Sequence, residues 1–252
     1  MTELREDGFL GGRLRIAQPV RGYRSGADAV MLAAACPAVA GQSVLELGCG
    51  AGVASLCLGW RVPGLRLVGL EQQADFAALA RNNARTNEIG LEVITGDLER
   101  PPSGLRSQSF DQVIANPPYF LSGTPAPQQG RAVARQERTS LSAWIDAGLR
   151  RLRPGGGFTL IQRADRLDDV LAGFRGRAGA ISVLPVASRM GRDAGRVLVM
   201  AQKGARTPLR LLAPLIMHAA PMHDGDREDL TTAARDILRE GKPITWVFTK
   251  VS

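Results

Sequence analysis

From Ser43 onward, short apolar stretches alternate with longer stretches of helical length. SVLELG (43–48) precedes VASLCLGW (53–60), and LRLVGLE (65–71) precedes ADFAALARNNARTN (74–87). The stretches that follow are LEVITGD (91–97), FDQVIANPPY (110–119), LSAWIDAGLRRLRPGG (141–156) and GFTLIQ (157–162). Strands that alternate with helices of this length form βαβ units, which lie side by side in a parallel sheet. We therefore expect an α/β fold with a Rossmann-like, doubly wound sheet.

The start of the chain departs from this alternation. Gly11-Gly12 separates two short alternating stretches and predicts a hairpin. GYRSGADAVMLAAACPA (22–38) predicts a helix that is capped by Ser25 or Asp28 and ended by Pro37.

Near the other end, AISVLPV (180–186) and RVLVMAQKG (196–204) are expected to pair antiparallel. The sheet is then mostly parallel with an antiparallel edge. No composition shift marks a second unit, so we expect a single domain over residues 1–252, with the hairpin and helix of residues 1–40 as an extension of the core.

The composition is that of a globular protein, with 44% hydrophobic and 22% charged residues. No run of about 18 apolar residues is present, so we expect no membrane span. The amino terminus, MTELREDGFL, carries acids where a signal peptide would be basic, which predicts a cytoplasmic protein. Cys36, Cys49 and Cys57 lack metal-ligand spacing, and no metal is expected.

The net charge of +8 favours a polyanionic partner, and nucleic acid in particular. Arginines contact phosphates and position RNA without reading its sequence. The candidates are Arg24 and a cluster in the loop after residue 120, namely Arg131, Arg135 and Arg138.

The first candidate binding motif is VLELGCGAG (44–52), in which Gly48, Gly50 and Gly52 link a strand to a helix. Glycines in such a turn let the backbone approach a ligand closely. The spacing differs from the dinucleotide fingerprint, and Glu46 would repel a pyrophosphate at this place. A cationic or zwitterionic ligand with an amino group fits better, although a tight structural turn remains the alternative.

Acidic side chains end the next two strands. Glu71 follows the glycines by about 21 residues, and a carboxylate there can accept both hydroxyls of a ribose. Asp97 can accept from the exocyclic amino group of an adenine. The alternatives are a helix cap at Glu71 and ordinary turn chemistry at Asp97.

Asn116, Pro117, Pro118 and Tyr119 follow the next strand. Proline cannot donate to a ladder, so the pair ends the strand in any case. The carboxyl end of a strand is also where open α/β sheets bind ligands, and two prolines make such a site rigid.

The order E-x-G-x-G-x-G, acid, Gly-Asp, Asn-Pro-Pro-Tyr resembles the S-adenosylmethionine-dependent methyltransferases with a Rossmann-like fold. The NPPY sequence is similar to that of the members that methylate planar amide or exocyclic amino nitrogens. Within them the chain most resembles the bacterial tRNA-valine adenine-N6 methyltransferase family, from Phe9 to Lys250.

The resemblance implies S-adenosyl-L-methionine as cofactor. Its implied ligands are Asp28, Glu46, Gly48, Gly50, Gly52, Glu71, Asp97 and Asn116. The implied catalytic residues are Asn116, Pro117, Pro118 and Tyr119. The Asn116 side-chain oxygen and the Pro117 carbonyl would accept the hydrogens of the acceptor amine, and Tyr119 would stack on the base.

The leading hypothesis is an N-methyltransferase acting on the N6 amino group of an adenine in tRNA. Methylation of a protein glutamine at N5 and of a ribosomal RNA guanine at N2 are the alternative reactions. A catalytically idle RNA-binding protein is the alternative without a reaction. His218 and His223 are interpreted as structural, and the sequence does not predict an oligomeric state.

Overall fold

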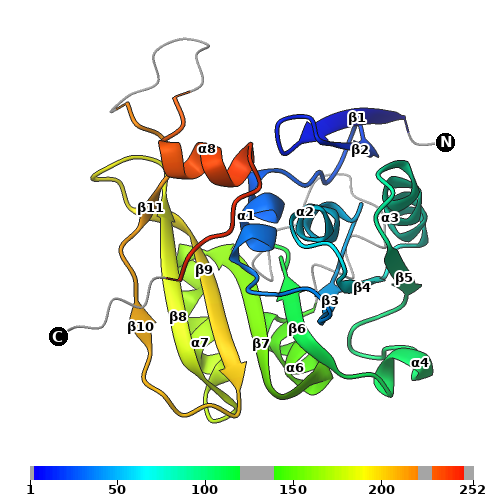
Figure 1. The fold of residues 1–252 in the computed structure, drawn as a ribbon. Helices are drawn as coiled ribbons and strands as arrows, with labels where there is room; N and C mark the ends of the chain where they lie inside the picture. Colours follow the sequence, from blue (N-terminus) through cyan, green and yellow to red (C-terminus); the bar gives the residue numbers. More distant parts are fainter. Residues whose placement is uncertain (1–2, 120–138, 221–228, 247–252) are drawn as a thin grey trace.

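The computed structural model describes residues 3–119, 139–220 and 229–246. In this part of the chain a nine-stranded sheet has the order β10-β8-β9-β7-β6-β3-β4-β5, with β11 also paired to β8 (Figure 1). All neighbouring strands are parallel except where β9 pairs with β7 and β8. The structure confirms the expected α/β sheet with its antiparallel edge.

The strands of this sheet are β3 (Ser43–Leu47), β4 (Arg66–Glu71), β5 (Leu91–Thr95), β6 (Phe110–Ala115), β7 (Leu152–Arg163), β8 (Ala178–Ala187), β9 (Ala194–Lys203), β10 (Arg210–Leu211) and β11 (Leu215–Ile216). The helices are α1 (Ala27–Ala35), α2 (Val53–Arg61), α3 (Ala74–Thr86), α4 (Ser103–Arg106), α6 (Leu141–Arg151), α7 (Leu167–Phe174) and α8 (Thr232–Leu238), with a 3-10 turn at Ala164–Arg166.

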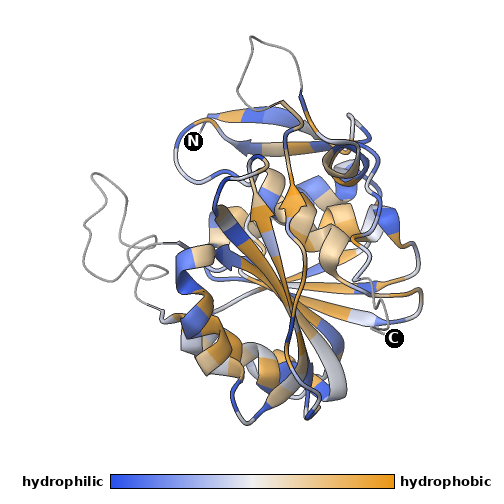
Figure 2. Ribbon diagram, turned by 90° about the vertical axis from the view of Figure 1, so that its left-hand side faces the viewer, coloured by the Kyte–Doolittle hydropathy of each residue, from blue (hydrophilic) through white to orange (hydrophobic). Residues whose placement is uncertain are grey.

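Successive residues of the central strands face two different cores. Val44 and Ile114 pack in the core that α1, α2 and α8 cover, whereas Leu45 and Val113 pack in the core that α6 and α7 cover. Figure 2 shows the apolar colour of the strands between these two helical layers. This alternation is the physical basis of the double winding, because each helix layer buries the opposite side of one sheet.

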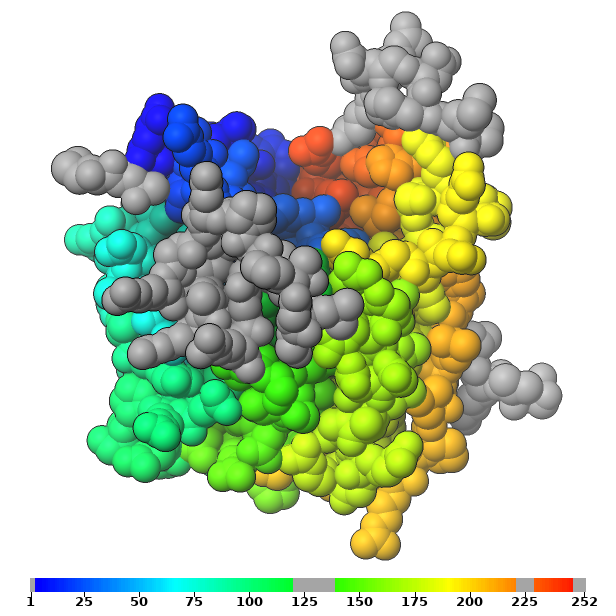
Figure 3. Space-filling model, turned by 180° about the vertical axis from the view of Figure 1, so that it is seen from behind, coloured from blue at the N-terminus to red at the C-terminus, as the bar shows by residue number. Residues whose placement is uncertain are grey.

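The amino-terminal hairpin consists of β1 (Leu4–Phe9) and β2 (Leu14–Pro19). Its turn is joined to the far end of the chain, since Arg13 donates to the Arg239 carbonyl and to Glu240, both at 2.6 Å. The blue hairpin and the red-orange α8 accordingly share one edge of the molecule (Figure 3). The hairpin is therefore fixed to the body rather than projecting from it.

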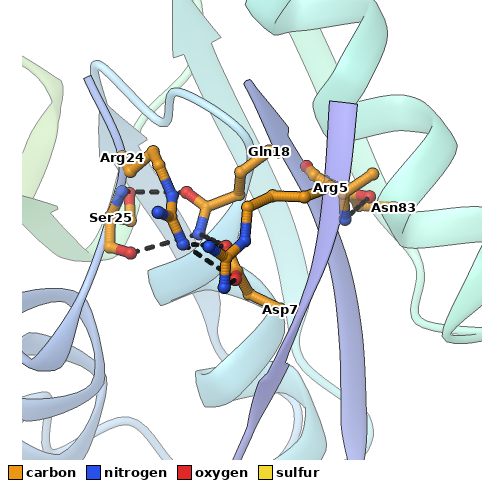
Figure 4. Close-up of polar contacts among 7 residues, drawn as sticks. Arg5, Asp7, Gln18, Arg24, Ser25 and Asn83 are labelled. Carbon is orange, nitrogen blue, oxygen red and sulfur yellow. Dashed lines mark hydrogen bonds and ion pairs between the residues drawn. The ribbon is translucent and has the colours of Figure 1, made fainter. Parts of the chain in front are cut away.

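Polar side chains tie the hairpin to the segment that leads into α1 (Figure 4). The Asp7 carboxylate binds Arg24 at 2.7 Å and Arg5 at 2.8 Å. The Gln18 side chain donates to the Ser25 carbonyl at 3.2 Å and accepts from the Ser25 N–H at 2.8 Å. The chain between β2 and α1 is thus held at both its side chains and its backbone.

α1 begins differently from the prediction. Gly26 occupies the N-cap position and no side chain caps the helix, so the expected cap at Ser25 or Asp28 is wrong. The Asp28 carboxylate instead binds the Tyr119 hydroxyl and Arg196, and the Ser25 backbone is bound to the Gln18 side chain.

The boundary between α6 and β7 also differs from the prediction. The helix ends at Arg151 and the strand begins at Leu152, five residues before the expected strand at 157. Leu152 pairs with Phe110 across an irregularity in the register, which extends β7 in a way that local composition does not indicate.

Glu46 lies inside the central strand β3 and is 4% exposed. Its Oε2 accepts from the Ser55 N–H at 2.9 Å and from the Ser55 hydroxyl at 2.5 Å, at the start of α2. Burial outweighs these bonds and raises the pKa of Glu46 from its ordinary 4.5 to about 8.

Gly148→Ala tests how closely α6 packs on the sheet. A Cβ at this position would lie 2.4 Å from Cε1 of Phe158, which is fully buried. The clash should outweigh the gain in helix propensity and lower the free energy of unfolding by about 1–3 kcal/mol. Urea unfolding measures the change. Gly104→Ala in α4, where a Cβ meets nothing within 4 Å, is the matched control, and equal stabilities of the two variants would contradict the packing.

Glu46→Gln tests the buried carboxyl. With a raised pKa the folded protein retains a proton that the unfolded chain has lost, so stability falls as pH rises from 4.5 toward about 8. Glutamine retains an acceptor for Ser55 without the titration, so the advantage of the variant over the wild type should grow with pH, to about 1–3 kcal/mol within this range. Urea unfolding at a series of pH values without added ligand measures both curves. Parallel curves would contradict the raised pKa.

Candidate active site

The carboxyl ends of four parallel strands form one edge of the sheet. Leu47 of β3 is in register with Leu70 of β4 and with Ala115 of β6. Glu71 is in register with Thr95 of β5. Because each predicted motif starts at or directly after these positions, the structure brings the glycine turn, the two acids and the NPPY sequence together.

The glycine turn needs its glycines for both conformation and space. Gly48, Gly50 and Gly52 have φ of +63°, +54° and +87°, in the left-handed region that glycine favours. A Cβ at Gly48 would also lie 2.4 Å from the Trp144 ring. Gly52 is the N-cap of α2, so the turn delivers the chain directly into the helix.

Glu71 closes the tip of β4 over this turn. Its two carboxylate oxygens accept the Gly50 N–H at 2.9 Å and the Gln73 N–H at 2.8 Å. The Glu71 carbonyl accepts the Gly96 N–H at 2.9 Å, which joins the ends of β4 and β5. Glu71 is 1% exposed, so this carboxylate is held rigidly beside the glycines.

Asp97 lies at the end of β5, where its Oδ1 accepts the Glu99 N–H at 2.9 Å. Asp97 lines a small hollow together with Gly48 and Trp144. The Trp144 Nε1 is buried and has no hydrogen-bond partner within the described residues. A buried donor without a partner is costly, so a polar ligand group in this region would relieve that cost.

A polar network lies at the NPPY sequence. The Tyr119 hydroxyl is 2.5 Å from Asp28 Oδ2 and 2.9 Å from Asn116 Oδ1. Arg196 of β9 donates from Nε to the same Asp28 oxygen at 3.0 Å. Its guanidinium lies 4.4 Å from the centroid of the Tyr119 ring. Burial and the Asp28 carboxylate raise the pKa of Tyr119, so its hydroxyl stays protonated.

Tyr23 completes the surroundings of the glycine turn. A Cβ at Gly50 would be 4.0 Å from the Tyr23 ring, and Tyr23 is 54% exposed. Tyr23, Trp144 and Arg196 are site residues that the sequence motifs do not indicate. None of them belongs to a motif, and each reaches the site through a contact between distant parts of the chain.

The predicted RNA contacts are only partly within the described residues. Arg24 lies within the described residues, and its guanidinium binds the Asp7 carboxylate. Arg131, Arg135 and Arg138 lie outside the described residues, as does His223. His218 lies 2.5 Å from Asp229, which also binds Arg189 at 2.7 Å. This cluster joins β8 to the segment before α8, in keeping with a structural role for His218.

In the described ranges no helix is both long and apolar enough to cross a membrane. The side chains of these ranges contain no group of three or more potential metal ligands from among His, Cys, Asp and Glu.

Comparisons with known proteins identify relatives over most of the chain. The model of the methyltransferase small domain matches residues 26–172. A tRNA1(Val) (adenine(37)-N6)-methyltransferase of Porphyromonas gingivalis is 35% identical over 173 residues, covering 65% of this chain and 68% of that protein. A protein of the same name from Shewanella baltica is 32% identical over 190 residues, covering 72% and 79%.

Solved structures share the fold. A predicted O-methyltransferase from Agrobacterium tumefaciens superimposes with a TM-score of 0.70 at 27% identity, covering 86% of this chain and 98% of that one. The 16S rRNA N2 G1207 methyltransferase of T. thermophilus has a TM-score of 0.54 at 19% identity, covering 80% and 50%.

The match to the family model extends over more than half of the chain and includes the glycine turn, both acids and the NPPY sequence. The sheet is that of the methyltransferase fold. The chain therefore belongs to the methyltransferase small domain family and is an S-adenosylmethionine-dependent methyltransferase.

Proposed function

We propose that this methyltransferase acts on the N6 amino group of an adenine in tRNA. The observation that carries the proposal is the Asn116 amide, which stands directly after β6 beside the glycine turn and is followed by two prolines. The names of the curated relatives, which specify adenine-N6 methylation of tRNA1(Val), support the choice of substrate.

The residues at the strand ends fit the cofactor. Glu71 would accept the ribose hydroxyls, since a carboxylate oxygen can accept more than one hydrogen bond. Asp97 would accept from the adenine amino group. Trp144 Nε1, which has no partner among the described residues, offers a donor in the same region. Glu46 and the glycine turn would face the amino acid end. When bound, S-adenosylmethionine supplies a methyl group activated by its positively charged sulfur.

The acceptor amine needs help from the protein because the lone pair of adenine N6 is delocalised into the ring. Two hydrogen-bond acceptors that hold the amine hydrogens favour the pyramidal form, in which the lone pair points out of the ring plane. We assign these acceptors to the Asn116 side-chain oxygen and the Pro117 carbonyl. Proline fixes the backbone, so both groups are in place before the substrate arrives.

The net positive charge suits an RNA substrate. Arg24 is bound to Asp7, and it would contact a phosphate with the part of its guanidinium that remains exposed. Arg131, Arg135 and Arg138 remain predicted phosphate contacts.

The single-domain organisation of residues 1–252 likewise remains a prediction.

Methyl transfer from labelled S-adenosylmethionine to three separate pools tests the substrate class. The pools are total tRNA from a strain lacking this protein, ribosomal RNA and cell protein. Labelled N6-methyladenosine in tRNA, identified by mass, is the expected result. Label in protein glutamine or in ribosomal RNA guanine would overturn the proposed substrate while leaving the cofactor assignment intact.

Asn116→Ala tests the acceptor site. Removal of the amide should lower the rate of methyl transfer by about 100-fold or more, because the amine loses an acceptor that holds it in the reactive form. The Kd for S-adenosylhomocysteine, measured by calorimetry, should change by no more than severalfold. Asn82→Ala on the exposed side of α3 is the matched control and should retain full activity. Loss of cofactor binding in Asn116→Ala would contradict the assigned role.

A further inference from the structure

Three side chains from distant parts of the chain form a network that reaches Asn116 through Tyr119. Asp28 comes from the first turn of α1, Tyr119 from the segment after β6 and Arg196 from the antiparallel strand β9. Asp28 and Arg196 are partly shielded, with 24% and 35% of their side chains exposed. The network therefore links the antiparallel edge of the sheet to the NPPY sequence.

The Tyr119 hydroxyl has one proton and two neighbouring oxygens that can accept it, Asp28 Oδ2 at 2.5 Å and Asn116 Oδ1 at 2.9 Å. The carboxylate is the stronger acceptor and the nearer one. Arg196 donates to the same carboxylate oxygen, so Asp28 Oδ2 already accepts from a second group. The proton therefore belongs on the bond between Tyr119 and Asp28.

With its hydroxyl proton directed at Asp28, the Tyr119 oxygen offers only lone pairs to Asn116. Two oxygens facing each other without a proton repel, whereas an amide nitrogen in the same place would donate to the hydroxyl. Rotation of the Asn116 amide by about 180° about its terminal torsion exchanges Oδ1 and Nδ2. The side chain occupies the same space after the rotation, because the oxygen and the nitrogen are nearly identical in size. The rotation also points Oδ1 away from Tyr119.

We propose that Arg196 and Asp28 are positioning residues that act through Tyr119 to present Oδ1 of Asn116 to the acceptor amine. Arg196 donates to Asp28 and lies over the Tyr119 ring, Asp28 accepts the hydrogen bond of the Tyr119 hydroxyl, and the Tyr119 oxygen then accepts from Asn116 Nδ2. The inference deepens the proposed function and rests on it, because it concerns how the amide is set for an amino group.

Nuclear magnetic resonance of the Asn116 side-chain amide tests this arrangement without any substrate. The signals are assigned with Asn116→Ala. One amide proton should show the downfield shift of a hydrogen bond in the wild type and lose it in Tyr119→Phe. Asp28→Asn and Arg196→Gln should weaken it, whereas Arg196→Lys, which retains the charge, should largely preserve it.

The matched control is Arg163→Gln. Arg163 pairs with Arg196 in the register of β7 and β9, but its guanidinium binds the exposed Asp165 instead. This variant should leave the Asn116 signals unchanged. Asn116 signals that are the same in the wild type and Tyr119→Phe would overturn the proposal, whatever the substrate is. Signals that change in Tyr119→Phe but in neither Asp28→Asn nor Arg196→Gln would overturn the roles of those two residues.

A double-mutant cycle on methyl transfer adds the functional readout. Arg196→Gln should lower kcat on the order of 10-fold to 100-fold, with the KM for the acceptor within about twofold, because an oriented group is lost rather than a binding contact. In the Tyr119→Phe background the same change should have no further effect. Losses that simply multiply would show that Arg196 acts independently of Tyr119, and would overturn the relay. If tRNA is not the acceptor, the amide signals still decide the inference.

Discussion

The parallel pairing of β3 with β4 on one side and β6 on the other determines where the candidate site lies. Leu47, Leu70 and Ala115 are in register, so the glycine turn, Glu71 and Asn116 follow at the same edge of the sheet. A shift of one residue in either pairing would turn every strand side chain to the opposite core. Both faces of these strands are buried, which makes such a shift costly and keeps the site in place.

Two buried carboxyl groups at this edge are each held by hydrogen-bond donors. The Glu71 carboxylate is tied to two backbone N–H groups, and Glu46 is tied to Ser55. Glu46 remains costly because its charge is buried, which its raised pKa reflects. A group of this kind in a central strand adds nothing to packing, and a positively charged ligand at the glycine turn would offset its cost. A hydrogen-bond acceptor on such a ligand would likewise satisfy Trp144 Nε1, a buried donor that has no partner among the described residues.

The sequence predicted the parts of the structure that local patterns encode. Strand and helix alternation indicated the sheet, and the spacing of Gly48, Glu71 and Asn116 indicated a common edge. It misassigned the cap of α1, because the Asp28 carboxylate binds Tyr119 and Arg196 from distant parts of the chain. It also misplaced the start of β7, because that depends on pairing with Phe110. Arg196 could not be found from local patterns, since its role depends on the antiparallel β9 passing beside β7.

The central claim is that the NPPY sequence holds the acceptor amine at one edge of the sheet. A crystal structure with S-adenosylhomocysteine and a short RNA containing the target adenosine tests it most directly. The account predicts the adenine N6 at about 3 Å from both Asn116 Oδ1 and the Pro117 carbonyl oxygen. A structure in which N6 contacts neither group, or in which Oδ1 still faces the Tyr119 hydroxyl while N6 is bound elsewhere, would contradict it.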